Sequence, residues 1–166
     1  MLAGLTTNEL STFDSFYFPL LPIKNIKKIK KFKRVLIIDN DFKMSNLLKS
    51  ILQNNKEFKI TIANDPYEAI DLMTGQVFDL IVIEWNLPML NGLETLMEVE
   101  KGFKFEPNLP LEWDNKKVPV IILSDSDKSS CKPPYTKHFK YFGYINKGIA
   151  IEHIIEHLMF HFERSA

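Results

Sequence analysis

Three short aliphatic runs, each followed at once by a polar residue, constrain the fold of this chain more than any other feature. They are residues 35–38 before Asp39, residues 80–83 before Glu84, and residues 118–123 before Ser124. A strand that is apolar at every position, rather than at every second position, has both of its faces buried. Such strands are typical of a parallel sheet that is covered by helices on both sides.

The segments between these runs carry the spacing of amphipathic helices. Apolar residues recur at intervals of three and four in residues 44–52, from Gly92 onward and in residues 151–162, and the pair Asp65–Pro66 is typical of a helix start. Two further strands are predicted at residues 59–63 and 141–145. The alternation predicts an α/β fold, namely a doubly wound, five-stranded parallel sheet with helices on both faces.

Charge divides the chain into a tail and a domain. Residues 1–34 hold seven basic and two acidic residues, although the whole chain has 21 of each and a formal net charge of zero. We expect residues 1–33 to form an N-terminal tail with a basic segment at 24–34, and residues 34–166 to form the domain. The basic segment is either a solvated lead-in to the first strand or an electrostatic tether to an acidic partner, nucleic acid or anionic lipid.

Composition and run lengths exclude several classes of protein. A net charge of zero gives no global attraction to nucleic acid, and the single cysteine, Cys131, excludes an internal disulfide and a multi-cysteine metal site. No apolar run reaches the roughly 18–20 residues of a membrane span. The first residues lack the basic start of a secretory signal, so we expect a cytoplasmic protein.

Residues with reactive or charged side chains follow the predicted strands at their carboxyl ends. In a doubly wound sheet these ends meet at one edge, where ligands bind. We therefore expect one site to combine the following residues: Asp39, Asn40, Asp41, Glu84, Ser124 and Lys147.

The pattern from residue 34 to residue 162 resembles the receiver domain of response regulators in two-component signalling. Residues 84–92 resemble the phosphoacceptor loop of the family, and of its single-domain chemotaxis regulator in particular. Residues 121–124 and 144–147 are similar to its fourth and fifth strands. The resemblance implies a flavodoxin-like strand order of 2-1-3-4-5. An insertion near residues 102–117 interrupts it and is either a loop that packs its own aromatic residues or an element that recognises a partner.

The resemblance also implies a role for each residue at the edge of the sheet. Glu84 stands at the position of the phosphoacceptor. The family holds Mg²⁺ in an acidic pocket, which corresponds here to Asp39, Asn40 and Asp41. Its switch residues correspond to the set Ser124, Tyr144 and Lys147.

Several departures from the family argue against ordinary phosphotransfer. The family has Asp where this chain has Glu84, and Glu reaches roughly 1.5 Å further. Asn40 replaces a metal-binding acid, so Mg²⁺ binding is weakened, Asp39 is left as its ligand, and we expect no cofactor. Gly148 follows Lys147 where the family usually has Pro. The pair Pro133–Pro134 predicts a fourth helix that is short, late or absent.

These features predict a non-enzymatic pseudo-receiver that acts by protein–protein contact without phosphorylation. In it, Glu84 would reach Lys147 or Ser124 as a partial phosphate mimic. The resemblance implies a histidine kinase, a phosphotransfer protein or an output protein as partner, and we expect no fused DNA-binding domain. The alternatives are an ion-paired relic without regulatory consequence, a receiver with residual phosphorylation, and a small Mg²⁺-dependent phosphatase similar to haloacid dehalogenases. In the phosphatase, Asp39 would be the nucleophile and Asp41 the general acid.

The last predicted helix carries histidines at every fourth position. His153, His157 and His161 share one face, and Phe160 points the same way. Neutral histidines four residues apart can bind zinc, but no fixed third ligand is evident, so the pattern favours an exposed polar face. The resemblance implies that the fourth-helix, fifth-strand and fifth-helix face contacts a partner or a second copy of the chain.

Overall fold

The structure, a computed structural model, describes residues 33–102, 117–131 and 136–164 of the 166-residue chain. The predicted tail and basic segment lie outside these residues, except for Lys33 and Arg34. Nearly all of the predicted insertion at 102–117 lies outside them too. The fold is therefore that of the predicted domain.

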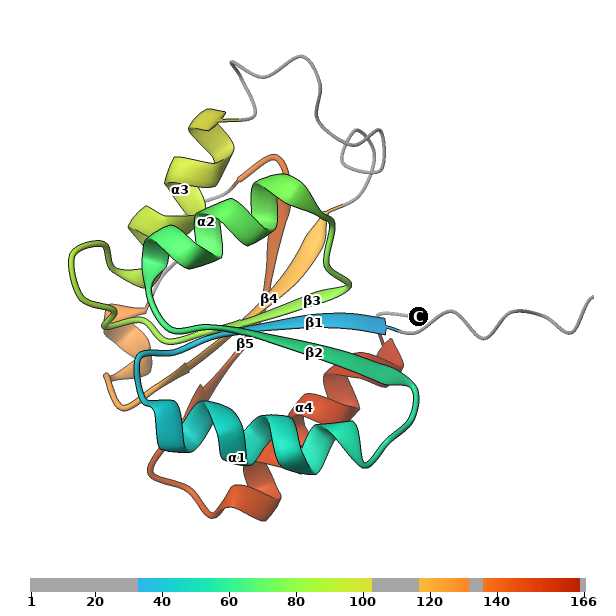
Figure 1. The fold of residues 1–166 in the computed structure, drawn as a ribbon. Helices are drawn as coiled ribbons and strands as arrows, with labels where there is room; N and C mark the ends of the chain where they lie inside the picture. Colours follow the sequence, from blue (N-terminus) through green and yellow to red (C-terminus); the bar gives the residue numbers. More distant parts are fainter. Residues whose placement is uncertain (1–32, 103–116, 132–135, 165–166) are drawn as a thin grey trace, which may run out of the picture. The chain divides into compact units, whose positions relative to one another are not determined.

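Five parallel strands form one sheet in the order β2-β1-β3-β4-β5 (Figure 1). The strands are β1 (Lys33–Ile38), β2 (Phe58–Ala63), β3 (Leu80–Ile83), β4 (Val118–Ser124) and β5 (Phe139–Asn146). Every residue of β3 and β4 is buried, as the continuous apolar runs predict. The predicted fold class and strand order are confirmed.

In the part of the chain that the structure describes, two helices cover each face of the sheet (Figure 1). They are α1 (Phe42–Gln53) and α4 (Ile151–Arg164) on one face, and α2 (Pro66–Gly75) and α3 (Gly92–Gly102) on the other. Strand β1 shows why its run must be apolar throughout. Val35 and Ile37 belong to the apolar cluster that includes residues of α1 and α4, whereas Leu36 and Ile38 belong to the cluster that includes residues of α2 and α3.

The segment between β4 and β5 contains a 3-10 turn, Lys128–Ser130, in its described residues, and no α-helix. Pro133 and Pro134 lie outside the described residues. The turn agrees with the expected loss of a full fourth helix, so that α4 takes the place of the family's fifth helix. No helix in the described ranges is both long enough and apolar enough to cross a membrane.

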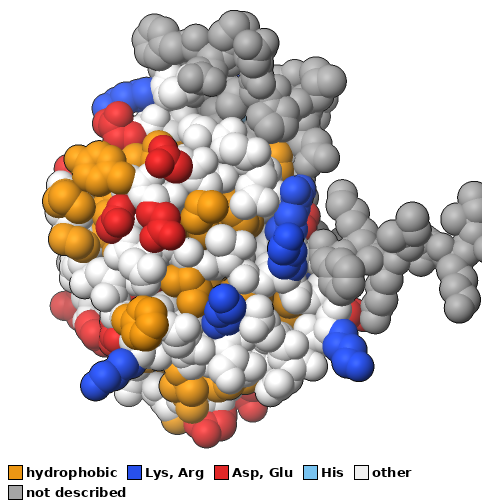
Figure 2. Space-filling model, in the orientation of Figure 1, with side chains coloured by type: hydrophobic (Ala, Val, Ile, Leu, Met, Phe, Trp, Pro, Cys, Tyr) orange, Lys and Arg blue, Asp and Glu red, His pale blue; other side chains and the backbone are white. Residues whose placement is uncertain are grey.

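Exposed apolar side chains are spread over the molecule. On the side shown in Figure 2, apolar side chains form separate patches with acidic and basic side chains between them. Large exposed apolar residues of the described ranges are Phe42, Leu47, Tyr67, Met89, Met97, Tyr141, Ile149 and Phe160. Because they come from several helices, loops and strands, apolar area alone does not mark a partner surface.

Candidate functional site

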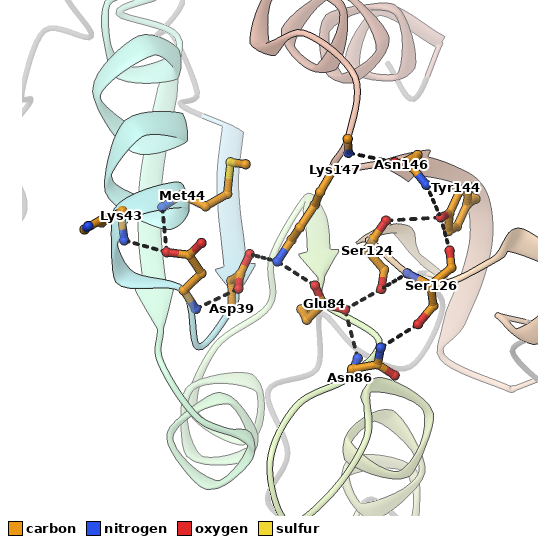
Figure 3. Close-up of polar contacts among 12 residues, drawn as sticks. Asp39, Lys43, Met44, Glu84, Asn86, Ser124, Ser126, Tyr144, Asn146 and Lys147 are labelled. Atoms are coloured by element: carbon orange, nitrogen blue, oxygen red, sulfur yellow. Dashed lines mark hydrogen bonds and ion pairs between the residues drawn. The ribbon is translucent and has the colours of Figure 1, made fainter.

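Four side chains from the carboxyl ends of four strands form a buried ionic cluster, which consists of Asp39, Glu84, Ser124 and Lys147 (Figure 3). Lys147 Nζ lies 2.7 Å from Asp39 Oδ2 and 2.5 Å from Glu84 Oε2. Asp39, Glu84 and Ser124 are buried, and the side chain of Lys147 is only 8% exposed. The parallel strands thus bring together residues that are far apart in sequence.

Both oxygen atoms of the Glu84 carboxylate have protein partners. Oε1 accepts hydrogen bonds from the Ser124 hydroxyl and from the backbone N–H of Asn86, the latter at 2.9 Å. Oε2 forms the ion pair with Lys147. The glutamate therefore contacts Ser124 and Lys147 at the same time, where the sequence had predicted one or the other.

The cluster holds two carboxylates and one ammonium group, and burial affects all three. Burial acts to raise the pKa of Glu84, but hydrogen bonds from Lys147, Ser124 and Asn86 outweigh it and leave this pKa below its ordinary value. For Asp39, burial dominates and raises the pKa in spite of the bond to Lys147. Burial acts to lower the pKa of Lys147, but the two carboxylates outweigh it, so this pKa is raised. Lys147 is thus held in its charged form.

A second set of hydrogen bonds links the cluster to the loop after β4. The Tyr144 hydroxyl donates to the backbone oxygens of Ser124, at 3.1 Å, and of Ser126. Asn146 Nδ2 donates to the Tyr144 oxygen at 3.2 Å, and the Ser126 N–H donates to Ser124 Oγ at 3.2 Å. Tyr144 is half-buried and packs against the core. The residues predicted as a switch therefore form one connected network with Glu84.

Two members of this network, Asn86 and Ser126, were not predicted from the sequence. Asn86 donates from its backbone to Glu84 and from its side-chain amide to Ser126 Oγ (Figure 3). The two residues join the loop after β3 to the loop after β4. A signal was available in the position of Asn86. The backbone N–H of a residue two positions after a buried carboxylate can reach that carboxylate.

The structure places Asn40 and Asp41 outside the buried ionic cluster. The Asp41 carboxylate accepts hydrogen bonds from the backbone N–H groups of Lys43, at 2.9 Å, and Met44, at 3.2 Å, and thereby caps α1. Asn40 is exposed. The reason is that α1 begins at Phe42, so its unpaired N–H groups take the nearest carboxylate. Of the predicted acidic pocket, Asp39 alone lies in the cluster.

The capping role of Asp41 gives a testable prediction. Replacing Asp41 with alanine removes the acceptor of two N–H groups of α1 and is expected to lower the free energy of unfolding by about 1 kcal/mol. Urea unfolding followed by circular dichroism measures the change. Asn40→Ala is the matched control, because this neighbour caps no helix. Equal effects of the two substitutions would contradict the assignment.

The arrangement does not fit Mg²⁺, a cation that prefers oxygen ligands. Each carboxylate oxygen of Asp39 and Glu84 already has a protein partner, and Asn40 contributes no carboxylate. Within the ranges that the structure describes, no group of three or more His, Cys, Asp or Glu side chains is placed to hold a metal ion. The Asp39 carboxylate, the acid of the expected pocket that lies in the cluster, contacts the Lys147 ammonium group and the Asp41 N–H.

The predicted partner face on α4 is only partly exposed. His153 and His157 are exposed, and Phe160 is 52% exposed. His161, which was expected on the same exposed face, is only partly exposed. Its ring packs edge-on against Phe142, with the ring centroids 5.3 Å apart, and a Cβ atom added to Gly143 would lie 2.9 Å from His161 Nε2. The absence of a side chain at Gly143 lets the imidazole pack onto β5.

The family model of the response regulator receiver domain matches residues 35–159. The probable transcriptional regulator ycf29 of Pyropia yezoensis is 31% identical over 91 residues, which are 55% of this chain and 36% of the relative. The chain spans about a third or less of the length of the curated relatives that it matches.

Solved structures show the same fold. The receiver domain of the Francisella response regulator 1452 superposes with a TM-score of 0.58 at 26% identity, covering 81% of this chain and 99% of that one. The signal receiver domain of an HD domain-containing protein from Pseudomonas fluorescens superposes with a TM-score of 0.62 at 15% identity, covering 81% and 98%. The second likeness supports the fold alone.

Proposed function

The chain belongs to the response-regulator receiver domain family, and from this we propose that it is a pseudo-receiver, a non-enzymatic module that binds a signalling partner without being phosphorylated. In this proposal Glu84 stands at the phosphoacceptor position. Its carboxylate binds Lys147 and Ser124, and Tyr144 links Ser124 to the loop after β4. A histidine kinase, a phosphotransfer protein or an output protein is the class of partner that we propose.

The simultaneous contact of Glu84 with Lys147 and Ser124 carries this proposal. In ordinary receivers a phosphoryl group on an aspartate binds the lysine and the hydroxyl at these two positions. The longer Glu side chain brings a carboxylate to both groups by itself. It supplies one negative charge and two oxygens, against about two charges and three oxygens for phosphate, so the mimicry is partial.

The link from Ser124 to Tyr144 favours a signalling role over an inert relic. An ion pair without consequence would need no connection to the surface. Here the hydroxyl of Ser124 contacts Glu84, its backbone oxygen accepts from Tyr144, and Tyr144 also holds the backbone of Ser126. A change in the Glu84 carboxylate would therefore be felt in the loop after β4.

The phosphatase alternative gains no support from the site. Its general acid would be Asp41, whose carboxylate caps α1 instead. Its nucleophile would be Asp39, whose oxygens are bound by Lys147 and by the Asp41 N–H. Neither carboxylate is free for that chemistry.

Acetyl phosphate tests the proposal directly. Incubation of the wild-type protein with acetyl phosphate and Mg²⁺ is expected to leave its intact mass unchanged, because Glu84 is already paired and Asn40 offers no charge for the metal. The matched double variant, Glu84→Asp with Asn40→Asp, shortens the acceptor and restores the second acid. It is expected to gain the mass of one phosphoryl group. A phosphoryl adduct on an acidic residue of the wild-type cluster would overturn the proposal.

A further inference from the structure

The outer face of α4 carries two histidines that have no partner in the described part of the chain. His153 and His157 are both exposed, and neither imidazole has a hydrogen bond or ion pair with another described residue. Four residues of helix separate them by about 6 Å along the axis and place both side chains on one face. Their ring nitrogens are therefore available to an external ligand.

Two neutral imidazoles with this spacing suit a zinc ion. Zinc binds histidine nitrogen at about 2.0–2.1 Å and takes four ligands in tetrahedral geometry. The described residues of one chain supply two of the four, His153 and His157. His161, one turn further on, packs against Phe142 and Gly143, and no described group of three His, Cys, Asp or Glu side chains could complete the set. Among the residues of one chain that the structure describes, the coordination remains half complete.

A second copy of the chain supplies the missing half. A twofold axis through the ion brings the same two histidines from the other copy, and this gives four nitrogen ligands. The charge on the helix points the same way. Glu152 and Glu156 are exposed beside the histidines, so two copies that met face to face would repel each other without a cation between them.

We propose that Zn²⁺ joins two copies of this chain through His153 and His157 of each α4 helix. The side chain of Phe160, which is 52% exposed and lies three residues beyond His157, would then be covered at the contact. The four histidines complete the ligand set of the zinc ion, and its positive charge offsets the repulsion between the carboxylates of the two helices. This association does not depend on the state of Glu84.

Sedimentation of the tag-free full chain during titration with ZnCl₂ tests the proposal. The wild-type protein is expected to double in mass, with one zinc bound for every two chains, and to return to a monomer on addition of EDTA. MgCl₂ is expected to have no effect, because imidazole is a poor ligand for Mg²⁺. His153→Gln and His157→Gln are each expected to abolish the zinc-dependent doubling.

Lys56→Gln is the control, because it changes an exposed side chain outside α4 and keeps both histidines and both glutamates of that helix. It is expected to retain the zinc-dependent dimer. Thermal unfolding of each variant checks that the fold is intact. A wild-type chain that stays monomeric at saturating zinc, or a zinc-dependent dimer that persists in both histidine variants, would overturn the proposal.

Discussion

Replacing Lys147 with methionine is expected to lower the free energy of unfolding by about 3–5 kcal/mol, the cost of leaving a buried charge without its partner. Lys147 is the cation that contacts both carboxylates of the buried ionic cluster, and its side chain is only 8% exposed. Methionine keeps an apolar stem of similar length but no charge. Lys59→Met, at an exposed lysine of β2, is the control and is expected to change stability by less than about 0.5 kcal/mol.

The effect of this substitution is expected to depend on pH. Without the ammonium group, burial is expected to raise the pKa of Asp39 further above its value in the unfolded chain and to shift the pKa of Glu84 upward. A group of this kind contributes stability below its unfolded pKa and loses it as the pH rises through the folded pKa. The deficit of the Lys147→Met protein relative to wild type is therefore expected to grow between about pH 4 and pH 7.

Urea unfolding across this pH range measures the deficit, and a charge-removal variant separates electrostatics from packing. Adding Asp39→Asn and Glu84→Gln to Lys147→Met removes both unpaired charges and is expected to restore most of the lost stability. A deficit that does not vary with pH, or a triple variant no more stable than Lys147→Met, would mean that packing and not charge explains the loss.

Replacing Gly92 with alanine is expected to lower the free energy of unfolding by about 1–3 kcal/mol, the usual cost of forcing an extra methyl group into a packed site. A Cβ atom at Gly92 would lie 2.7 Å from the backbone oxygen of Glu84 and 3.3 Å from Cα of Trp85. These are backbone atoms, so they cannot rotate away as a flexible side chain would. The start of α3 would be pushed off the segment that carries Glu84.

Gly75→Ala is the matched control for this second prediction. Gly75 is the last residue of α2, and a Cβ atom there meets nothing within 4 Å. Because alanine loses less conformational freedom than glycine in a helix, this substitution is expected to stabilise by about 0.5–1 kcal/mol. Chemical denaturation compares the two variants, and the same sign for both would contradict the close contact at Gly92.

The sequence was sufficient to predict the sheet and the meeting of its polar strand ends. Burial on both faces demands aliphatic residues at every position, and the runs at 35–38, 80–83 and 118–123 leave few other folds open. Parallel pairing then brings the carboxyl ends together without any further signal. The reach of Glu84 to Lys147 or Ser124 followed from the resemblance and from the length of the side chain, but its contact with both at once did not.

The contacts of single side chains were harder to predict, because some residues had more than one possible partner and the sequence pattern does not choose between them. Asp41 had two uses open to it, a pocket and a helix cap, and the early start of α1 decided between them. His161 had the same spacing as His153 and His157, yet it packs on Gly143 of a strand that the helix periodicity does not describe. The bond between Asn86 and Ser126 joins two loops whose relative positions only the folded chain defines.

The pairing of Glu84 with Lys147 and Ser124 has a consequence for timing. An acyl phosphate hydrolyses, so the activated state of a phosphorylated receiver lasts only as long as this bond. A glutamate side chain is part of the polypeptide and persists for the lifetime of the protein. If Glu84 substitutes for the phosphoryl group, the strength of the output follows copy number, and synthesis and degradation replace a kinase and a phosphatase as its controls.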